Sequence, residues 1–221
     1  STKILETKRN FLYLWGSIFT DMDKRLFLID GHALVFKMYY AFLRHPMINS
    51  KGADMSILFG FTKYILELIE KEKPTHLAIA FDPPGGTFRN EIYTEYKANR
   101  DATPQLVIDS LEPLCGICKA LQIPVLLIPG FEADDVIGTL AKQAENAGFE
   151  VYMATPDKDY GQLVSEHIFM YRMRHTGGFE LLGPKEVCDK YGLQHQSQVI
   201  DLLGLMGDAS DNIPGCKGVG E

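Results

Sequence analysis

The chain has no long apolar run and only four cysteines in 221 residues. No stretch reaches the roughly 18 apolar residues of a membrane-spanning helix, so we expect no membrane segment. Nothing in the cysteine pattern demands a disulfide, which fits a reducing cytoplasm. Cys115 and Cys118, spaced as CGIC, could form a redox pair. Both lie in an amphipathic stretch, however, and we interpret them as small buried residues.

Positive charge is also scarce, because 22 Lys and Arg residues face 29 Asp and Glu residues and the formal net charge is -7. A nucleic-acid binder needs cations for its phosphate contacts. Net charge is an average, however, and acids gathered in one site leave room for a local basic face. The six histidines, His32 included, have no partner at the spacing of zinc ligands. The sequence therefore argues against a zinc site without excluding nucleic acid.

With 46% hydrophobic and 23% charged residues, the chain has the composition of an ordinary globular protein. Continuous apolar runs predict buried parallel strands at 25–30, 75–82, 123–129, 150–157 and 167–172. Apolar residues at helical spacing predict helices between them, at 53–73, 104–122 and 132–148. This alternation predicts an α/β fold in which helices cover both faces of a central, mostly parallel sheet.

The pattern divides the chain into three parts. We interpret residues 1–21 as an upstream extension, poorly ordered and outside the fold. Residues 22–183 hold the predicted α/β domain. Residues 184–221 contain two further helical stretches and a glycine-rich end, IPGCKGVGE, which we interpret as a truncated helical appendage.

Acidic residues follow the predicted strands. Because ligands of an open parallel sheet bind beyond the carboxyl ends of its strands, we expect acids there to converge. Other acids begin the helix at 132–148 or belong to GDASDN in the appendage. The full set is Asp30, Asp82, Glu132, Asp134, Asp135, Asp157, Asp159, Asp208 and Asp211.

A single aspartate at such a position usually caps a helix. The whole set is different, since carboxylates within about 10 Å repel one another unless cations lie between them. Oxygen ligands without His or Cys favour hard ions such as Mg²⁺ or Mn²⁺. Two such ions about 4 Å apart support phosphodiester hydrolysis.

A second pattern lies between Asp82 and residue 104. After PPGG, three cations alternate with two tyrosines, which suits single-stranded nucleic acid because cations meet phosphates and rings stack on bases. Acids in the same segment fit a solvated loop equally well, and composition does not choose between the two. The five residues are Arg89, Tyr93, Tyr96, Lys97 and Arg100.

The glycines of NIPGCKGVGE form a third pattern, GxxGxG. A turn of this kind between helices presents bare backbone N–H groups to a phosphate, although glycine turns are also common elsewhere. The glycines are Gly215, Gly218 and Gly220.

Five motifs in order resemble the 5′ nuclease domains of bacterial DNA polymerase I, which belong to the flap-endonuclease family. The resemblance covers roughly 26–221 and implies a PIN-like 5′ nuclease fold followed by a helix-hairpin-helix region. The motifs are LFLIDGHALVFK, AIAFDPPGGTFRNEIYTEYKANR, GFEADDVIGTLA, TPDKDYGQLV and LMGDASDNIPGCKGVGE.

The resemblance implies a structure-specific 5′-3′ exonuclease or flap endonuclease that uses two or more Mg²⁺ ions, with Mn²⁺ able to substitute. The implied substrates are DNA with 5′ flaps, nicks or 5′ ends, including RNA-primed ends. The implied roles are primer removal in replication and DNA repair in the cytoplasm, with a polymerase domain downstream.

Roles for single residues follow from the same resemblance. The nine carboxylates become the metal cluster, and residues 83–103 become a helical arch through which a 5′ single strand reaches it. Lys97 contacts the scissile phosphate beside Tyr96, and Arg89 and Lys37 complete the catalytic set. Lys37 stands where the family usually has arginine, which keeps the charge but loses bidentate phosphate binding. The glycine turn becomes the hairpin that grips duplex phosphates and holds K⁺.

Three alternatives remain. A PIN-type single-strand ribonuclease shares the acidic sheet edge, but residues 83–103 and GDASDN speak against it. A non-catalytic DNA-binding module would have lost carboxylates, and none is lost. A haloacid-dehalogenase-like phosphotransferase is suggested by Asp157-Lys158-Asp159, yet it needs an Asp pair after the first strand, where Asp30 stands alone.

Overall fold

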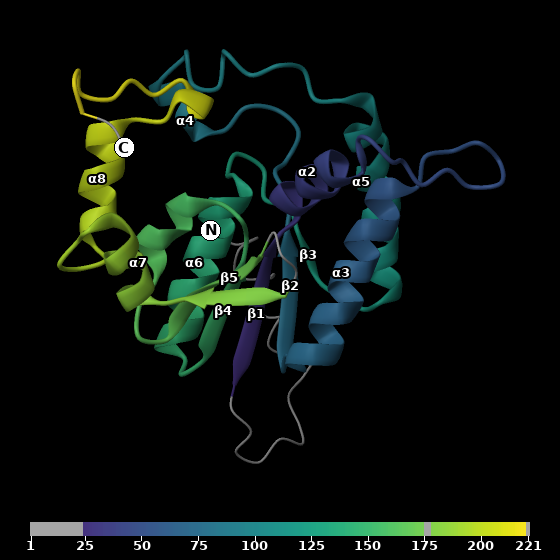
Figure 1. Cartoon of the computed structure of the whole chain (residues 1–221), viewed down its shortest axis with the longest axis horizontal. Helices are drawn as coiled ribbons and strands as arrows, with labels where there is room; N and C mark the ends of the chain where they lie inside the picture. The colour runs from purple at the N-terminus through teal and green to yellow at the C-terminus, as the bar shows by residue number, and fades with distance from the viewer. Residues whose placement is uncertain (1–23, 175–177, 220–221) are drawn as a thin grey trace.

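A six-stranded sheet runs through the computed structural model, which describes residues 24–174 and 178–219 (Figure 1). The strand order is β3-β2-β1-β4-β5-β6, with β6 antiparallel to β5 and all other pairs parallel. The strands are β1 (Arg25–Asp30), β2 (His76–Ala80), β3 (Val125–Leu126), β4 (Glu150–Ala154), β5 (Ile168–Met173) and β6 (Phe179–Leu182).

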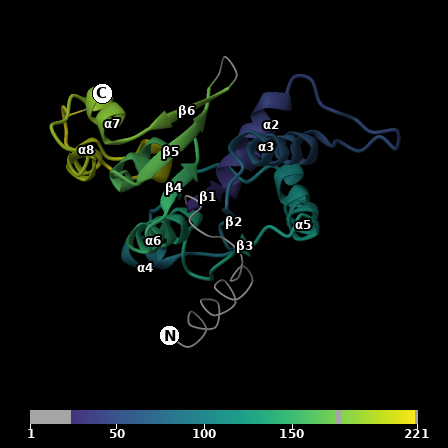
Figure 2. The same cartoon turned by 90° about the horizontal axis from the view of Figure 1, so that it is seen from below.

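Helices cover both faces of the sheet, as the two views show (Figures 1 and 2). Helices α2, α3 and α5 pack on one face, and α6, η1, α7 and α8 pack on the other. The helices are α2 (Gly31–Phe42), α3 (Ser56–Glu72), α4 (Phe88–Ile92), α5 (Gln105–Ala120), α6 (Ala133–Asn146), η1 (Lys158–Leu163), α7 (Pro184–Tyr191), α8 (Gln198–Met206) and η2 (Ala209–Asp211).

Strand β1 explains why the sequence shows continuous apolar runs. Phe27 and Ile29 point into the core under α2, α3 and α5, whereas Leu26 and Leu28 point into the core under α6. All four are buried, because a parallel strand between two helical layers has no face in water. The predicted α/β sheet is confirmed, with helices on both of its faces.

The five predicted strands and the three predicted helices all occur, with shifted ends. Helix α2 was not predicted, because it follows β1 without a connecting turn. Strand β6 was also missed, since its four residues are too short to show a period. Cys115 and Cys118 lie on α5 as unpaired thiols. Cys118 is buried, as we interpreted it, whereas Cys115 is only partly buried.

The C-terminal helices share the core of the sheet. Val187 of α7 and Val199 of α8 are buried in the same cluster as the second face of β1.

The division of the chain at residue 183 stays a prediction. Residues 1–21 and Gly220 lie outside the described residues. In the part of the chain that the structure describes, no helix is long and apolar enough to cross a membrane.

Candidate active site

The order of the strands places a crevice at one edge of the sheet. From β1 the chain continues to β2 on one side, whereas β4 and β5 lie on the other. Connections that diverge in this way open a crevice beyond the carboxyl ends of the strands, which is where open α/β sheets bind ligands. The acidic ends of β1 and β2 and the acidic loop after β4 border this edge.

Asp30 ends β1 and is held by three hydrogen bonds. Its Oδ1 accepts from the backbone N–H of Ala33 at 2.9 Å and so caps α2. Its Oδ2 accepts from the hydroxyls of Thr155 and Tyr160, both at 3.2 Å. The side chain is buried, and burial together with the negative charge of Asp82 raises the pKa of Asp30 to about 6. Asp30 thus caps a helix, as expected of a single aspartate, and also carries a negative charge that burial disfavours.

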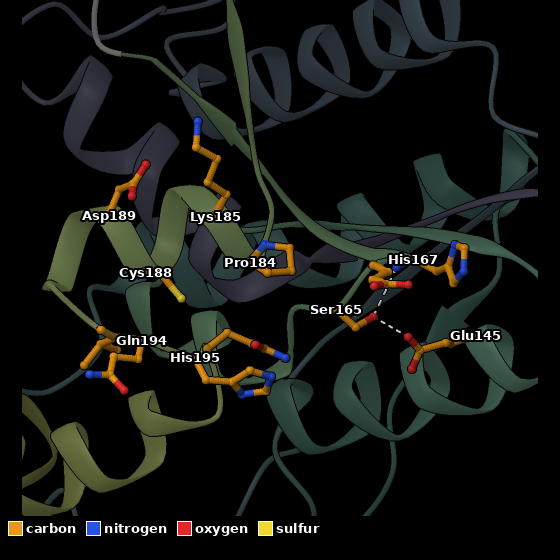
Figure 3. A pocket seen from close by; sticks show the side chains of 12 residues that line it. Glu145, Ser165, His167, Pro184, Lys185, Cys188, Asp189, Gln194 and His195 are labelled. Atoms are coloured by element: carbon orange, nitrogen blue, oxygen red, sulfur yellow. Dashed lines mark hydrogen bonds between the residues drawn. The ribbon is translucent and has the colours of Figure 1, made fainter.

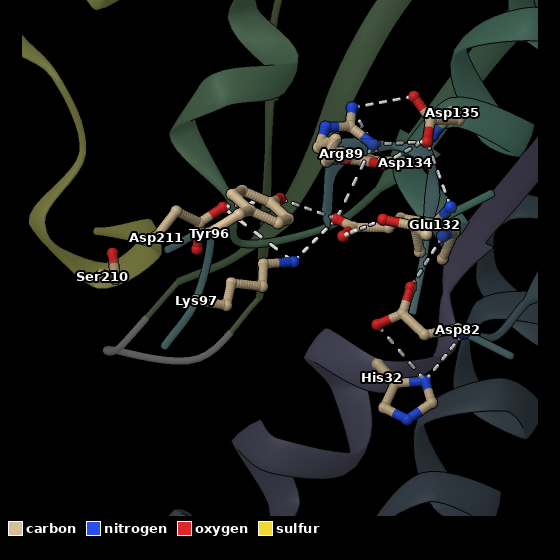
Figure 4. Close-up of polar contacts among 12 residues, drawn as sticks. His32, Asp82, Arg89, Tyr96, Lys97, Glu132, Asp134, Asp135, Ser210 and Asp211 are labelled. Atoms are coloured by element: carbon tan, nitrogen blue, oxygen red, sulfur yellow. Dashed lines mark hydrogen bonds and ion pairs between the residues drawn. The ribbon is translucent and has the colours of Figure 1, made fainter. Parts of the chain in front are cut away.

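Asp82 joins the end of β2 to the start of α6. Its Oδ1 accepts from the backbone N–H of Ala133 at 2.7 Å. The imidazole Nδ1 of His32 accepts from the backbone N–H of Asp82 at 3.0 Å and lies 3.8 Å from its Oδ2 (Figure 4). Burial lowers the pKa of His32, so the neutral ring is favoured. His32 is therefore a hydrogen-bonded neighbour of this acid, in keeping with a satisfied core histidine.

The N-cap residue and the first turn of α6 together carry three acids, and the guanidinium of Arg89 on α4 lies against them. Arg89 binds Asp135 with both terminal nitrogens, at 2.6 and 2.8 Å, and comes within 4.0 Å of Glu132 and of Asp134. This bidentate pair is the strong form of an arginine–carboxylate contact. It raises the pKa of Arg89 further, so the cation is permanent.

Glu132 is also bound by Lys97 and Tyr96 (Figure 4). The Lys97 Nζ lies 2.7 Å from Glu132 Oε2 and 3.9 Å from Asp211 Oδ2. The buried hydroxyl of Tyr96 is 3.1 Å from the same Glu132 oxygen and 3.0 Å from Asp211 Oδ2. Burial and these two carboxylates raise the pKa of Tyr96, so the phenol stays a donor. Tyr96 and Lys97 therefore bring an acid of α6 and an acid of η2 together.

The acids after β4 have a different setting. The Asp157 Oδ1 accepts from the backbone N–H of Asp159 at 2.9 Å. Among the described residues, the buried Oδ1 of Asp159 has no hydrogen-bond partner. Burial, with the charges of Asp157 and Asp208, raises the pKa of Asp159 to about 6. A buried carboxylate oxygen without a partner, close to two further acids, fits a hard divalent cation.

The acids are close but not gathered at a single point. Within residues 24–174 and 178–219, no three Asp, Glu, His or Cys side chains stand closely enough to hold one metal ion together. The reason lies in the contacts above, because Glu132, Asp135 and Asp211 turn toward the cations of residues 83–103. The ligand set proposed from the sequence stays a prediction.

Comparison with known proteins identifies the family of this chain. Residues 25–192 match the family model described as the 5′-3′ exonuclease, N-terminal resolvase-like domain. The chain belongs to this 5′-3′ exonuclease family. Among relatives, DNA polymerase I of Bacillus caldotenax is 40% identical over 202 residues, which are 90% of this chain and 23% of that protein. DNA polymerase I of Deinococcus radiodurans is 43% identical over 195 residues, 88% of this chain and 20% of the relative.

The chain thus spans about a fifth to a quarter of the length of these relatives. Solved structures agree in fold. The 5′-exonuclease of phage T5 with bound zinc aligns with a TM-score of 0.74 at 22% identity, covering 89% of this chain and 71% of that one. The catalytic core of Rad2 in complex with DNA aligns at 0.54 and 18%, covering 90% and 58%. The resemblance inferred from the motifs is confirmed.

The structure places the other predicted residues of this exonuclease-family chain in several settings. Lys37 on α2 donates to the carbonyl of Met173 at the end of β5, at 3.3 Å, and forms no hydrogen bond or ion pair with the acids of the described residues. The Tyr93 hydroxyl donates to the carbonyl of Asn212 at 3.3 Å. The guanidinium of Arg100 pairs with Asp211. Residues 83–103 contain one short helix, α4, followed by turns rather than a continuous helical arch.

Two glycines of the predicted phosphate turn are described. Gly215 lies against the end of α8, where a Cβ would come within 2.0 Å of the Met206 carbonyl oxygen, so the close packing requires glycine. Gly218 has a φ of +84°, a conformation that side chains disfavour. Their role toward phosphate stays a prediction.

Sequence reasoning overlooked several residues that contact the acids. Thr155 and Tyr160 bind Asp30, and the Thr87 hydroxyl donates to Glu132 Oε1 at 3.3 Å. Each stands within a few residues of a quoted motif acid or glycine pair, which is the signal that could have found them.

An open cavity of about 710 Å³ lies elsewhere (Figure 3). It is lined by Glu145 at the end of α6, by Ser165 and His167 before β5, and by Lys185 and Cys188 of α7. Glu145 follows Asp135 by ten residues on α6, so about 15 Å of helix separates it from the acids of the first turn. The cavity contains none of the predicted site residues and lies at the opposite edge of the sheet.

Proposed function

We propose that the chain is a structure-specific 5′-3′ exonuclease and flap endonuclease that hydrolyses DNA phosphodiester bonds with two divalent metal ions. One observation carries the proposal: acids from β1, β2, α6, η1 and η2 border one sheet edge, and a segment with Arg89, Tyr96 and Lys97 crosses it. Membership of the 5′-3′ exonuclease family supports the reaction class.

The donor set supports Mg²⁺, with Mn²⁺ as a substitute, because all its ligands are carboxylate oxygens. Asp159, with its partnerless buried oxygen, is the clearest position for such an ion. When bound, two ions supply an activated water and stabilise the charge on the leaving oxygen. The residues that would hold them are Asp30, Asp82, Glu132, Asp134, Asp135, Asp157, Asp159, Asp208 and Asp211.

The cations of the chain would act on the phosphate itself. In hydrolysis a water oxygen forms a bond to phosphorus while a phosphorus–oxygen bond of the backbone breaks, leaving a phosphate monoester and an alcohol. Negative charge grows on the phosphoryl oxygens, and Lys97 and Arg89 lie where they could leave Glu132 and Asp135 to stabilise it. Tyr96 would orient Lys97, since its hydroxyl meets the same two acids.

The proposed substrates are DNA with 5′ flaps, nicks or 5′ ends, including RNA-primed ends. Residues 83–103, with Tyr93 and Arg100, would guide the single strand, and the turn at Gly215, Gly218 and Gly220 would grip the duplex with K⁺ as a helix-hairpin-helix. A phage T5 flap endonuclease of the same fold was solved with DNA and metal ions. The relatives' name supports a downstream polymerase domain and roles in cytoplasmic DNA replication and repair.

The deciding experiment follows cleavage of a labelled 5′-flap duplex with Mg²⁺ and with excess EDTA. Cleavage near the base of the flap that requires Mg²⁺ is the expected result. The matched control is a covalently closed circular duplex of the same sequence, which has no flap, nick or 5′ end and should stay uncut. Cutting in EDTA would overturn the metal mechanism.

The same assay separates the alternatives. A single-stranded RNA of the flap's sequence serves as the substrate of a PIN-type ribonuclease, and preferred cleavage of that RNA would favour this alternative. Binding of flap DNA without cleavage in Mg²⁺ or Mn²⁺ would favour a non-catalytic DNA-binding module.

A further inference from the structure

Two segments far apart in sequence are hydrogen-bonded beside the acids. We call residues 93–100 the arm segment and residues 208–213 the acid loop. The side-chain amide of Asn99 donates to the carbonyl of Ala209 at 2.7 Å. The side-chain amide of Asn212 donates in the other direction, to the carbonyl of Glu95, also at 2.7 Å. These two reciprocal hydrogen bonds form a clasp between the segments.

Lys97 lies between the two clasp positions of the arm segment, Glu95 and Asn99, and has an unusual backbone conformation. Its φ is 58°, a left-handed value that lysine rarely adopts. The backbone N–H of Lys97 donates to the carbonyl of Asp211 at 2.9 Å, and its own carbonyl accepts from the N–H of Arg100 at 3.1 Å. Such a conformation persists only where the surroundings hold it. Here the acid loop holds the Lys97 backbone, through the hydrogen bond to Asp211.

The backbone conformation decides where the ammonium goes. With Lys97 held against Asp211, its Nζ reaches Glu132 at 2.7 Å, so the side chain spans from the arm segment to α6. If the arm segment left the acid loop, Lys97 would relax toward right-handed backbone geometry and its side chain would leave with it. The clasp therefore controls Lys97 without touching Glu132.

Asparagine suits both positions. Neither amide carries a charge, and each donates its hydrogen bond to a backbone carbonyl and not to a carboxylate. Asn212 has a φ of 59°, which asparagine tolerates better than most residues. Asn99 is exposed, and Asn212 is partly so, which makes substitution compatible with folding.

We propose that Asn99 and Asn212 are positioning residues that clasp the arm segment to the acid loop and thereby hold Lys97 at the acids. The kinetic consequence rests on the proposed function, since it requires Lys97 to act on the phosphate. The clasp itself is independent of that function, and the experiment treats the two separately.

Limited trypsin digestion of the protein in EDTA tests the clasp. We expect slow cleavage after Lys97 and Arg100 in the wild type, located by mass spectrometry. In Asn99→Ala and in Asn212→Gly, which keeps a left-handed residue, cleavage there should be about fivefold faster, because one hydrogen bond is lost and proteolysis follows local opening.

The matched control is Gln198→Ala. Its amide oxygen accepts from two backbone N–H groups in the exposed connection before α8, so a comparable contact is lost elsewhere. Cleavage after Lys97 and Arg100 should then stay at the wild-type rate. If both asparagine variants are cut at the wild-type rate as well, the clasp does not exist in solution.

Single-turnover cleavage of flap DNA with Mg²⁺ tests the positioning. Asn99→Ala should lower the rate about fivefold with unchanged DNA affinity, and Asn99→Gln, which keeps an amide donor, should recover part of it. In a Lys97→Ala background, Asn99→Ala should have no further effect, because positioning acts through Lys97. A full additional loss there would overturn the proposal. If the wild type does not cut at all, the proposed function fails, and the trypsin result still decides whether the clasp exists.

Discussion

The acids at the start of α6 and those after β4 border the same edge of the sheet, yet their neighbours differ. Glu132 and Asp135 are bound by Lys97 and Arg89 at 2.7 and 2.6 Å. Asp159 lies close to other acids, and its buried Oδ1 has no hydrogen-bond partner among the described residues. Cations of the chain thus form short ion pairs with one group, whereas in the other the charge of Lys158 acts on Asp159 without giving its Oδ1 a hydrogen-bond partner among the described residues.

This difference indicates that the two groups of acids have different roles toward a divalent ion. A divalent ion that binds near α6 must compete with permanent side-chain cations, whereas one that binds near Asp159 satisfies an oxygen that the protein leaves without a partner. The same cations become available to a phosphate when an ion takes their place. Four variants test whether the two groups of acids differ in this way, beginning with the one expected to lose most activity.

The largest effect is expected at Asp159, whose buried Oδ1 has no hydrogen-bond partner among the described residues. Asp159→Asn should lower the single-turnover cleavage rate by about a thousandfold, because metal-ion stabilisation contributes several kcal/mol. Asp109→Asn on the exposed face of α5, where Asp109 accepts only from Gln105, is the control and should cut normally. A rate for Asp159→Asn near that of the wild type would remove Asp159 from the site.

Removal of a cation near α6 should have a smaller effect. Lys97→Ala should slow cleavage about a hundredfold, since the loss of one contact to transition-state charge costs about 2–4 kcal/mol. Its DNA affinity should change little. Rapid-quench rates and equilibrium binding to the same flap substrate separate the two quantities. Weaker affinity with an unchanged rate would make Lys97 a binding residue only.

The stability of the metal-free protein should depend on pH through the buried acids. Burial raises the pKa of Asp30 from its ordinary value of 3.8 to about 6 in the folded state, so the folded protein holds this proton more tightly. Its contribution to the free energy of unfolding is therefore greatest below about pH 4 and is lost as the pH rises to about 6. Asp159 shifts in the same direction.

Asp30→Asn isolates this contribution, because the amide keeps an oxygen for the cap at Ala33. In EDTA at pH 7 it should be about 2 kcal/mol more stable than the wild type, and the gain should shrink toward pH 4. Urea unfolding across this pH range measures it. A gain that does not depend on pH would show that the charge of Asp30 is not the cause.

The smallest effect concerns competition between protein cations and metal. Arg89→Met should lower the Mg²⁺ concentration at the midpoint of a binding titration by about fivefold, because removal of an ion pair worth about 1 kcal/mol frees Asp135. Isothermal titration without DNA measures this midpoint. Arg174→Met, at an ion pair with Glu180 away from the acids, is the control. Weaker Mg²⁺ binding by Arg89→Met would contradict the competition.

Much of this protein could be predicted from sequence because its signals are local. Continuous apolar runs marked the strands between two helical layers, and acids directly after those strands reach one edge once the strands are parallel. The motifs placed the chain in its family. Helix α2 escaped because Asp30 ends β1 and caps the helix in a single residue.

Which cation pairs with which acid depends on the tertiary structure. Asn99 and Ala209 lie 110 positions apart, and Lys97 and Glu132 lie 35 apart. Contacts of this kind depend on how irregular segments pack, and those segments have no period for a sequence to display. The left-handed backbone of Lys97, the pairing of Arg89 with Asp135 and the placement of Lys37 on Met173 follow from that packing. Local sequence patterns therefore specify the acids and the edge they occupy, whereas the packing of the folded chain specifies their partners.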